Sequence, residues 1–325
     1  MRSPVMRIAK VVIAACIGLV ATLAQAAGFR SIEVPADAFG PALKAAVWTP
    51  CAAPAGDMVV GSSTVPGVRD CPIAGDRLGL IVVSHGYSGN YLGHHDTAEV
   101  LTDAGFVVVA LNHPDDTASN KDPVANATAL VDRPTDVKRL IDFMLGAWSD
   151  APRIDPLRIG FFGFSRGGYT GLVIAGATPD FQHAHVRCPN PSAPVCAGQP
   201  APVWTHDGRV RAIVIADPLS FFPTRDSLKD VKVPLQLWAS ERGGDGVQPE
   251  DVAAVARDLP VRPDFRVVPG TAHFAFLTPC SPGLAKRVPQ ICTDDAGFDR
   301  VAFHQKFDAE VLAFFRTHLA MGSKP

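Results

Sequence analysis

The sequence predicts an α/β fold with a mostly parallel central sheet and helices on both of its faces. Short apolar runs of strand length alternate with longer amphipathic segments, which is the order that βαβ units impose. The runs contain few polar residues, so they are expected to be buried on both faces. A composition of 47% hydrophobic and 19% charged residues supplies a large core and excludes a disordered chain.

The expected elements follow one another along most of the chain. Strands are predicted for the apolar runs at 78–84, 105–111, 158–164, 210–216, 234–239 and 265–268. Helices are predicted for the amphipathic segments at 98–104, 135–145, 169–177, 251–259 and 299–319. The last of these is expected to close the domain.

Residues 1–26 are predicted to be a cleavable export signal. Basic residues precede an apolar run at 11–23, and Ala24-Gln25-Ala26 fits the small-x-small cleavage rule. The run is short for a membrane-spanning helix, so no stable membrane insertion is expected. The protein is therefore expected to be exported, to a periplasm or out of the cell, with residues 27–325 as one domain.

Six of the seven cysteines lie after this segment, and an exported setting favours their oxidation. Proximity pairs them locally, each pair within a Pro/Gly-rich stretch, and disulfides on long loops are expected rather than a zinc site, which would need shorter spacings. The expected disulfides are Cys51–Cys71, Cys188–Cys196 and Cys280–Cys292.

Residues 179–206 interrupt the alternation of strands and helices with several prolines and one of the predicted disulfides. We interpret this segment as an insertion near the top of the sheet. It is either a lid over the site or a surface loop remote from the chemistry.

The motif Gly163-Phe164-Ser165-Arg166-Gly167 indicates a nucleophilic serine. It matches G-x-S-x-G, with an apolar strand before it and a helix after it. Such a turn is so tight that its serine is strained, and small residues two positions away let strand and helix approach. Ser165 is therefore the expected nucleophile, at the positive end of the following helix.

An oxyanion hole is expected beside this serine. The sequence Ser84-His85-Gly86-Tyr87 follows the first strong strand, in the position of the loop that supplies one backbone donor. The expected donors are the N–H groups of Tyr87 and Arg166. The side chain of His85 is interpreted as a packing group, and that of Arg166 as a surface or neighbour-pairing group.

The base must come late in the chain, and His273 fits because it follows the last expected strand. His304 and His318, on the closing helix, are interpreted as surface or interface residues. His94-His95-Asp96 could suggest metal ligands, but adjacent residues on one helix turn face different directions. This run is therefore interpreted as a solvated helix start. No metal ion and no organic cofactor are expected.

Three carboxylates are candidates for the acid of the triad. Asp217 follows the fourth expected strand, and Asp245 follows the fifth, together with the weaker candidate Glu241. An acid at either place can orient the imidazole of His273 and stabilise its charged form. The physics of the sequence leaves this choice open.

With these motifs the chain resembles the α/β-hydrolases, in their platelet-activating-factor acetylhydrolase and dienelactone-hydrolase-like branch. The resemblance covers most of the chain after residue 26. It implies the α/β-hydrolase fold. It also favours Asp217, because acetylhydrolases of this kind place the acid in an Asp-x-x-x-Phe-Pro-like run. The Asp245 segment instead resembles the pattern of dienelactone hydrolases. Those enzymes use cysteine where this chain has Ser165. The motifs that carry the resemblance are Ser84-His85-Gly86, Asn112-His113-Pro114-Asp115-Asp116, Gly163 to Gly168 and Asp217-Pro218-Leu219-Ser220-Phe221-Phe222-Pro223.

These features predict a serine hydrolase that cleaves carboxylic esters with short acyl groups through an acyl-enzyme. The alternatives are a serine peptidase or amidase on the same fold, and a binding protein that has lost activity. The expected partner is a small-molecule ester. A net charge of −2 without a basic stripe argues against nucleic acid.

Overall fold

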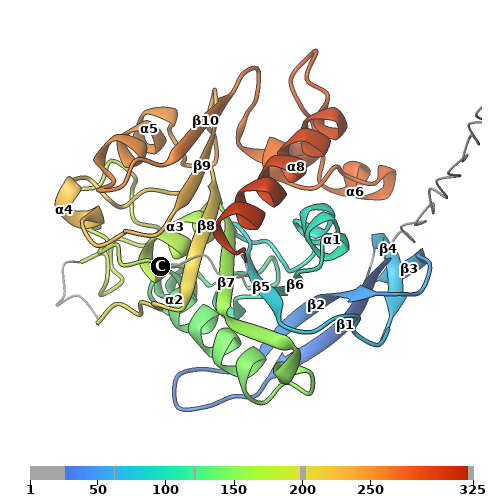
Figure 1. Cartoon of the computed structure of the whole chain (residues 1–325). Coiled ribbons are helices and arrows are strands. Elements are labelled where there is room, and N and C mark those ends of the chain that lie inside the picture. Colours follow the sequence, from blue (N-terminus) through green and yellow to red (C-terminus); the bar gives the residue numbers. More distant parts are fainter. Residues whose placement is uncertain (1–25, 62, 121, 198–202, 321–325) are drawn as a thin grey trace, which may run out of the picture.

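The structure, a computed structural model, describes residues 26–61, 63–120, 122–197 and 203–320. Its strands form one sheet in the order β10-β9-β8-β7-β5-β6-β2-β1-β4-β3 (Figure 1). All pairings from β10 to β6 are parallel, whereas β2 pairs antiparallel with β6 and β1 antiparallel with β2. The prediction of a mostly parallel sheet is confirmed.

The parallel strands coincide closely with the predicted apolar runs. Two have the predicted bounds, and the others differ at their ends by up to four residues. They are β5 (Leu78–Ser84), β6 (Val107–Leu111), β7 (Ile154–Phe164), β8 (Val210–Ala216), β9 (Leu235–Ser240) and β10 (Asp264–Val268).

The antiparallel strands at the start of the sheet were not predicted. β1 pairs along its whole length with β2, from Ala26 opposite Cys51 to Val34 opposite Leu43. β1 begins next to the predicted cleavage point, and the predicted signal up to residue 25 lies outside the described residues. The four strands are β1 (Ala26–Val34), β2 (Leu43–Cys51), β3 (Gly56–Val60) and β4 (Ser63–Arg69).

Helices cover both faces of the sheet, as predicted. α1 (His95–Asp103) and α8 (Arg300–His318) lie on one face, and α2 (Pro123–Leu145), α3 (Arg166–Ile174) and α5 (Pro249–Asp258) lie on the other (Figure 1). The remaining helices are short. They are α4 (Arg225–Leu228), α6 (Pro282–Arg287), α7 (Pro289–Cys292) and the 3-10 turns η1 (Pro114–Asp116), η2 (Ala151–Arg153) and η3 (His273–Phe276).

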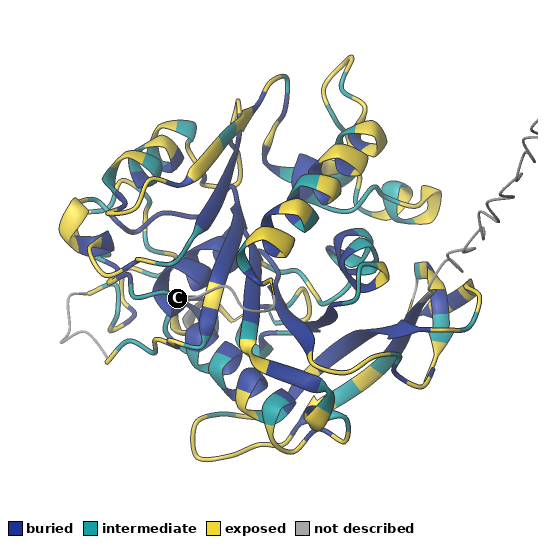
Figure 2. Cartoon of the chain, viewed as in Figure 1, coloured by how far each residue is buried: buried dark blue, intermediate teal, exposed yellow. Residues whose placement is uncertain are grey.

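The period-2 geometry of the strands divides the core into two clusters. In β5, Leu80 and Val82 face α2 and α3, whereas Ile81 and Val83 face α1 and α8. Figure 2 shows the central strands buried and the exposed residues on the outer surfaces of the helices. Burial on both faces explains why the strands are almost free of polar residues.

The connections reverse direction between β5 and β7. From β5 the chain passes to β6 on one side and then returns to β7 on the other, where Ser84 of β5 lies beside Gly163 of β7. Ligands in open α/β sheets bind at the carboxyl ends of strands at such a switch point. This position therefore selects the loops after β5 and β7 as the place for a site.

The three predicted disulfides, Cys51–Cys71, Cys188–Cys196 and Cys280–Cys292, are present. Disulfides of this kind form and persist in an oxidising compartment, which agrees with the predicted export of the protein. In the described part of the chain, no helix has the length and apolar character needed to cross a membrane.

The insertion at 179–206 contains neither helix nor strand where it is described, and residues 198–202 lie outside the described part. Its Phe181 packs against Tyr169 of α3, against Trp204 and against Phe221. A role as a lid stays a prediction.

Candidate active site

Ser165 lies at the bend between β7 and α3. Its backbone has φ 55° and ψ −116°, a strained conformation for a residue with a side chain. Hydrogen bonds hold it there, because Ser165 N–H donates to the Ala216 carbonyl (3.0 Å) and Leu219 N–H donates to the Ser165 carbonyl (3.1 Å). The serine is thereby fixed at the N-terminus of α3 and tied to the loop after β8.

The glycines of the motif are sterically required. A Cβ atom on Gly167 would lie 1.9 Å from the Ser84 carbonyl oxygen, and one on Gly163 would lie 2.2 Å from the Gly167 carbonyl oxygen. Both contacts involve backbone atoms, which cannot move aside cheaply. The predicted close approach of β7 and α3 occurs at Gly163, and Gly167 in addition lets the start of α3 lie against the end of β5.

His273 begins η3 and is paired with Asp217. Its Nδ1 lies 3.0 Å from Asp217 Oδ2, and both side chains are 1% exposed. The carboxylate also accepts hydrogen bonds from Ser240 N–H (2.6 Å) and Ser240 Oγ (2.5 Å). These two donors fix the orientation of the carboxylate, so that Oδ2 can also accept a hydrogen bond from the imidazole.

The other two candidate acids point elsewhere. Asp245 lies at φ 49° in an exposed turn, and no hydrogen bond or ion pair joins it to His273 in the described structure. Glu241 is exposed as well, and its Oε2 accepts from Gly270 N–H (2.8 Å). The structure therefore brings Asp217 to the histidine, and leaves Asp245 and Glu241 apart from it.

The histidine ring lies against the turn that carries the serine. Phe164, the neighbour of Ser165, stacks on the His273 imidazole with the ring centroids 4.6 Å apart. His273 N–H donates to the Gly243 carbonyl (2.8 Å), which anchors the backbone of the turn. His273 Nε2 is buried, and no group in the described part of the chain is hydrogen-bonded to it. This nitrogen is therefore available for a proton from another group.

The loop after β5 reaches the serine. A Cβ atom on Gly86 would lie 3.1 Å from Ser165 Cβ, so only a glycine fits there without displacement. Tyr87 and Arg166 flank this contact, and the Arg166 guanidinium lies 4.3 Å from the centroid of the Tyr87 ring. Within the described part of the chain, neither backbone N–H donates a hydrogen bond. Both amides remain free to stabilise an oxyanion.

A buried charge cluster supports this loop from below, and the sequence analysis did not identify it. Arg133 of α2 donates to Asp116 Oδ2 (2.6 Å), to Ser84 Oγ (3.2 Å) and to the His85 carbonyl. Arg166 also donates to Asp116 Oδ2 (3.1 Å) and is 7% exposed. Of its two predicted roles, the neighbour-pairing group is confirmed and the surface group was wrong. A signal was present, since Arg133 lies on the apolar stripe of α2 with Leu130, Val137 and Leu140.

Two neutral histidines complete the support. His85 Nδ1–H donates to the Gly86 carbonyl (2.6 Å), and its Nε2 accepts from His113 N–H (3.2 Å). Burial, reinforced by the charge of Arg133, lowers the pKa of His85 to about 3. Burial likewise holds the pKa of His113 well below its usual range. The packing role predicted for His85 agrees with these contacts.

Other histidines differ from their predicted surroundings. His94 is 2% exposed and packs edge-on against Phe162 and Phe164, so a solvated helix start was wrong. His304 is 3% exposed and lies against Asp96, so its interpretation as a surface residue was wrong too. Both residues are buried because α1 and α8 pack over the sheet, which places His94 against β7 and His304 against α1.

Comparisons with known proteins agree with the architecture. No family model matches the sequence, and no match was found among the curated proteins. Among solved structures, a ferulic acid esterase from Streptomyces cinnamoneus is similar with a TM-score of 0.63 over 94% of this chain and 94% of that one, at 17% sequence identity. At this identity the likeness concerns the fold. Together with the sheet order, it shows that the chain has an α/β fold with a mostly parallel central sheet.

Proposed function

We propose that this protein is a serine hydrolase that cleaves carboxylic esters with short acyl groups. The observation that carries the proposal is the buried Asp217–His273 pair, whose ring packs against the bend that strains Ser165. Ser165, His273 and Asp217 are assigned as nucleophile, base and acid. The description of the similar structure as an esterase supports ester hydrolysis as the reaction.

The geometry supports a two-step acyl transfer. Asp217 accepts the Nδ1–H of His273 and so leaves the Nε2 lone pair to take the Ser165 proton. The serine oxygen then attacks the ester carbonyl, and the N–H groups of Tyr87 and Arg166 stabilise the oxyanion. His273 returns the proton to the leaving alcohol. Water, activated by the same histidine, then releases the acid from the acyl-enzyme.

The place of the acid favours the acetylhydrolase-like branch within the fold. Asp217 follows β8, whereas the dienelactone-hydrolase-like position, occupied here by Asp245, follows β9. Membership of this branch, and with it the preference for short acyl groups, is part of the proposal.

The proposal is tested with Ser165→Ala and p-nitrophenyl acetate. We expect kcat/KM to fall by roughly a thousandfold or more with an unchanged circular dichroism spectrum, because the nucleophile is lost and the fold is kept. Wild-type protein should also bind a fluorophosphonate probe covalently, and the variant should not. Unchanged turnover in Ser165→Ala would refute the assignment.

Substrate class is tested on the wild-type protein with paired substrates. p-Nitrophenyl acetate, the octanoate ester, ethyl ferulate and p-nitroacetanilide differ in acyl length, acyl aromaticity and leaving group. We expect the acetate ester to have the highest kcat/KM of the four. Faster cleavage of the anilide would move the assignment to an amidase, and faster cleavage of the octanoate or ferulate would overturn the short-acyl preference.

A further inference from the structure

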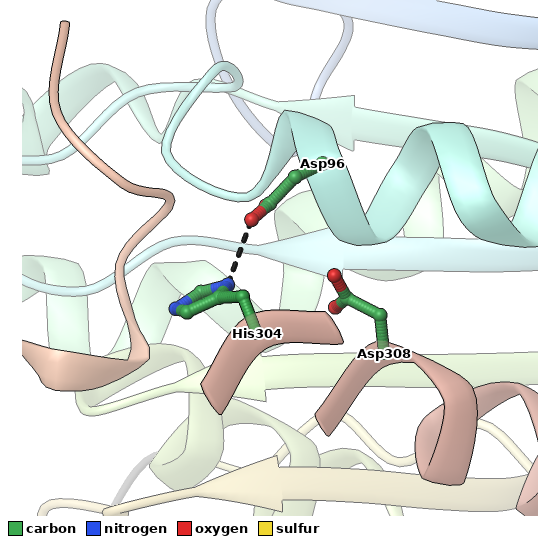
Figure 3. Close-up of side chains that lie close together, drawn as sticks. All are labelled: Asp96, His304 and Asp308. Atoms are coloured by element: carbon green, nitrogen blue, oxygen red, sulfur yellow. Dashed lines mark ion pairs between the residues drawn. The ribbon is translucent and has the colours of Figure 1, made fainter. Parts of the chain in front are cut away.

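A second cluster of chemically active side chains lies outside the proposed triad, between α1 and α8. Asp96 comes from the first turn of α1, and His304 and Asp308 come from successive turns of α8 (Figure 3). One donor atom from each residue lies within 4.8 Å of the other two. His304 and Asp308 are buried, and the Asp96 side chain is 20% exposed.

The hydrogen bond of His304 defines its tautomer. Nε2 lies 2.9 Å from the Ala275 carbonyl oxygen, which can only accept, so Nε2 carries the hydrogen. In the neutral ring Nδ1 then presents a lone pair, and it lies 2.7 Å from Asp96 Oδ2. These two atoms form an ion pair when the imidazole carries a second proton, and within the described part of the chain neither has any other hydrogen-bond partner. Two electron-pair donors this close need a proton or a metal ion between them.

The remaining atoms of the carboxylates are already occupied. Asp96 Oδ1 accepts from Thr278 Oγ1 (2.5 Å) and from Thr97 N–H (2.9 Å), and Asp308 Oδ1 accepts from Thr97 Oγ1 (2.6 Å). In the described structure no lysine or arginine forms an ion pair with either carboxylate; the nearby His95 is paired with Glu99. His304, when protonated, is therefore the cationic side chain that pairs with Asp96, and a bound metal ion would take the place of that proton.

We infer that Asp96, His304 and Asp308 bind a divalent metal ion of the Zn²⁺ class. One imidazole and two carboxylates are a donor set suited to Zn²⁺, and three protein ligands leave room for water. The surrounding contacts are those of metal sites, since the far nitrogen of the histidine donates to a carbonyl and each carboxylate is oriented by a threonine hydroxyl. The sequence analysis expected no metal, because it considered His94-His95-Asp96 without α8.

The ion would join α1 and α8 to the turn that carries His273. Ala275, whose carbonyl accepts from His304, belongs to η3, and Thr278 lies two residues after the end of that turn. This places the site in a structural role, one layer away from the proposed triad. The inference goes beyond the proposed function and does not depend on it.

The test is titration of ZnCl₂ into tag-free, full-length protein that has been stripped with EDTA and dialysed. We expect about one equivalent to bind to the wild-type protein and to raise its thermal midpoint by several degrees. Asp308→Asn should weaken binding by roughly a hundredfold or more, since an amide is a poor ligand. This variant keeps the shape of the side chain and an oxygen for Thr97, so its fold is expected to persist.

His304→Gln provides a second ligand variant, and His318→Gln, also on α8 and outside the cluster, is the matched control. We expect the first to lose binding and the second to bind as the wild type does. The inference is overturned if stripped wild-type protein binds no Zn²⁺, or if Asp308→Asn binds it as tightly as the wild type. Neither result depends on hydrolysis, so failure here leaves the proposed function standing.

Discussion

Replacing Asp217 with asparagine tests the reasoning about the triad most directly. Asp217 Oδ1 accepts from Ser240 N–H (2.6 Å), and this bond selects the orientation of an asparagine amide, with its oxygen at that position. The amide nitrogen must then occupy the place of Oδ2, 3.0 Å from His273 Nδ1. Since this nitrogen is a donor, it favours the tautomer whose proton is on Nε2. His273 then cannot accept the Ser165 proton.

The expected loss follows from the tautomer and the burial together. Both side chains are 1% exposed, so water has little room to replace the lost acceptor. A tautomer change of this kind costs about ten-thousandfold in kcat in serine hydrolases that use a His–Asp pair. This corresponds to about 5 kcal/mol of transition-state stabilisation. The fold should tolerate the change, because the Ser240 hydroxyl can rotate and donate elsewhere.

The assay is kcat and KM for p-nitrophenyl acetate, with Asp245→Asn as the matched control. Asp217 and Asp245 both have positive φ, 43° and 49°, so the two substitutions place the same new residue in similar backbone conformations. We expect Asp245→Asn to retain turnover within about twofold, since its side chain is exposed. The reasoning is refuted if Asp217→Asn stays within tenfold of the wild type, or if Asp245→Asn shows the large loss.

Three further predictions concern the support of the site. Gly167→Ala should abolish ester hydrolysis and lower the thermal midpoint, because its Cβ would lie 1.9 Å from the Ser84 carbonyl oxygen, whereas Gly208→Ala, with open space around it, should change neither. Arg133→Met should reduce the urea-measured free energy of unfolding by about 3–5 kcal/mol, since it removes the closest partner of the buried Asp116; a loss below about 1 kcal/mol would contradict this. His85, with a pKa of about 3 when folded and an unfolded value of 6.5, takes up its proton first in the unfolded chain, so its contribution to folding stability falls as the pH drops below 6.5. In His85→Gln the loss between pH 7 and pH 5, measured by urea titration, should be smaller by about 2 kcal/mol, and an unchanged loss would contradict the neutral assignment.

The parallel half of the sheet was predictable because its strands are buried on both faces and therefore read as continuous apolar runs. Runs such as 78–84 and 210–216 match β5 and β8 at both ends. β3 and β4 were not predicted because each is partly exposed. Their alternating burial leaves only a few apolar residues, in a stretch that contains Gly and Pro. Antiparallel edge strands with one wet face carry a weaker signal in a single sequence.

The proposed site was predictable where local backbone constraints dictate the residue types. The bend around Ser165 demands glycine at fixed positions, so the sequence displays it directly. The cluster of Arg133, Asp116 and His113 has no such requirement, because its members are joined only by the packing of α2 against the loop after β6 and the end of β5. The pairing of Asp96 with His304, across more than two hundred residues, likewise arises only when α1 meets α8. Long-range side-chain contacts of this kind produce no periodic pattern in the amino-acid sequence.

The choice between Asp217 and Asp245 shows how strand order bears on what residue patterns leave open. β8 lies directly beside β7, so an acid at the end of β8 is adjacent to the serine bend, and backbone hydrogen bonds between residues 165, 216 and 219 lock the two loops together. β9 lies one strand further out, and the turn after it runs through Gly243 to Gly246, which carries Asp245 into solvent. Gly243 instead contributes its carbonyl to the His273 N–H. In the proposed triad, the loop after β9 therefore positions the base through its backbone, and the loop after β8 supplies the carboxylate.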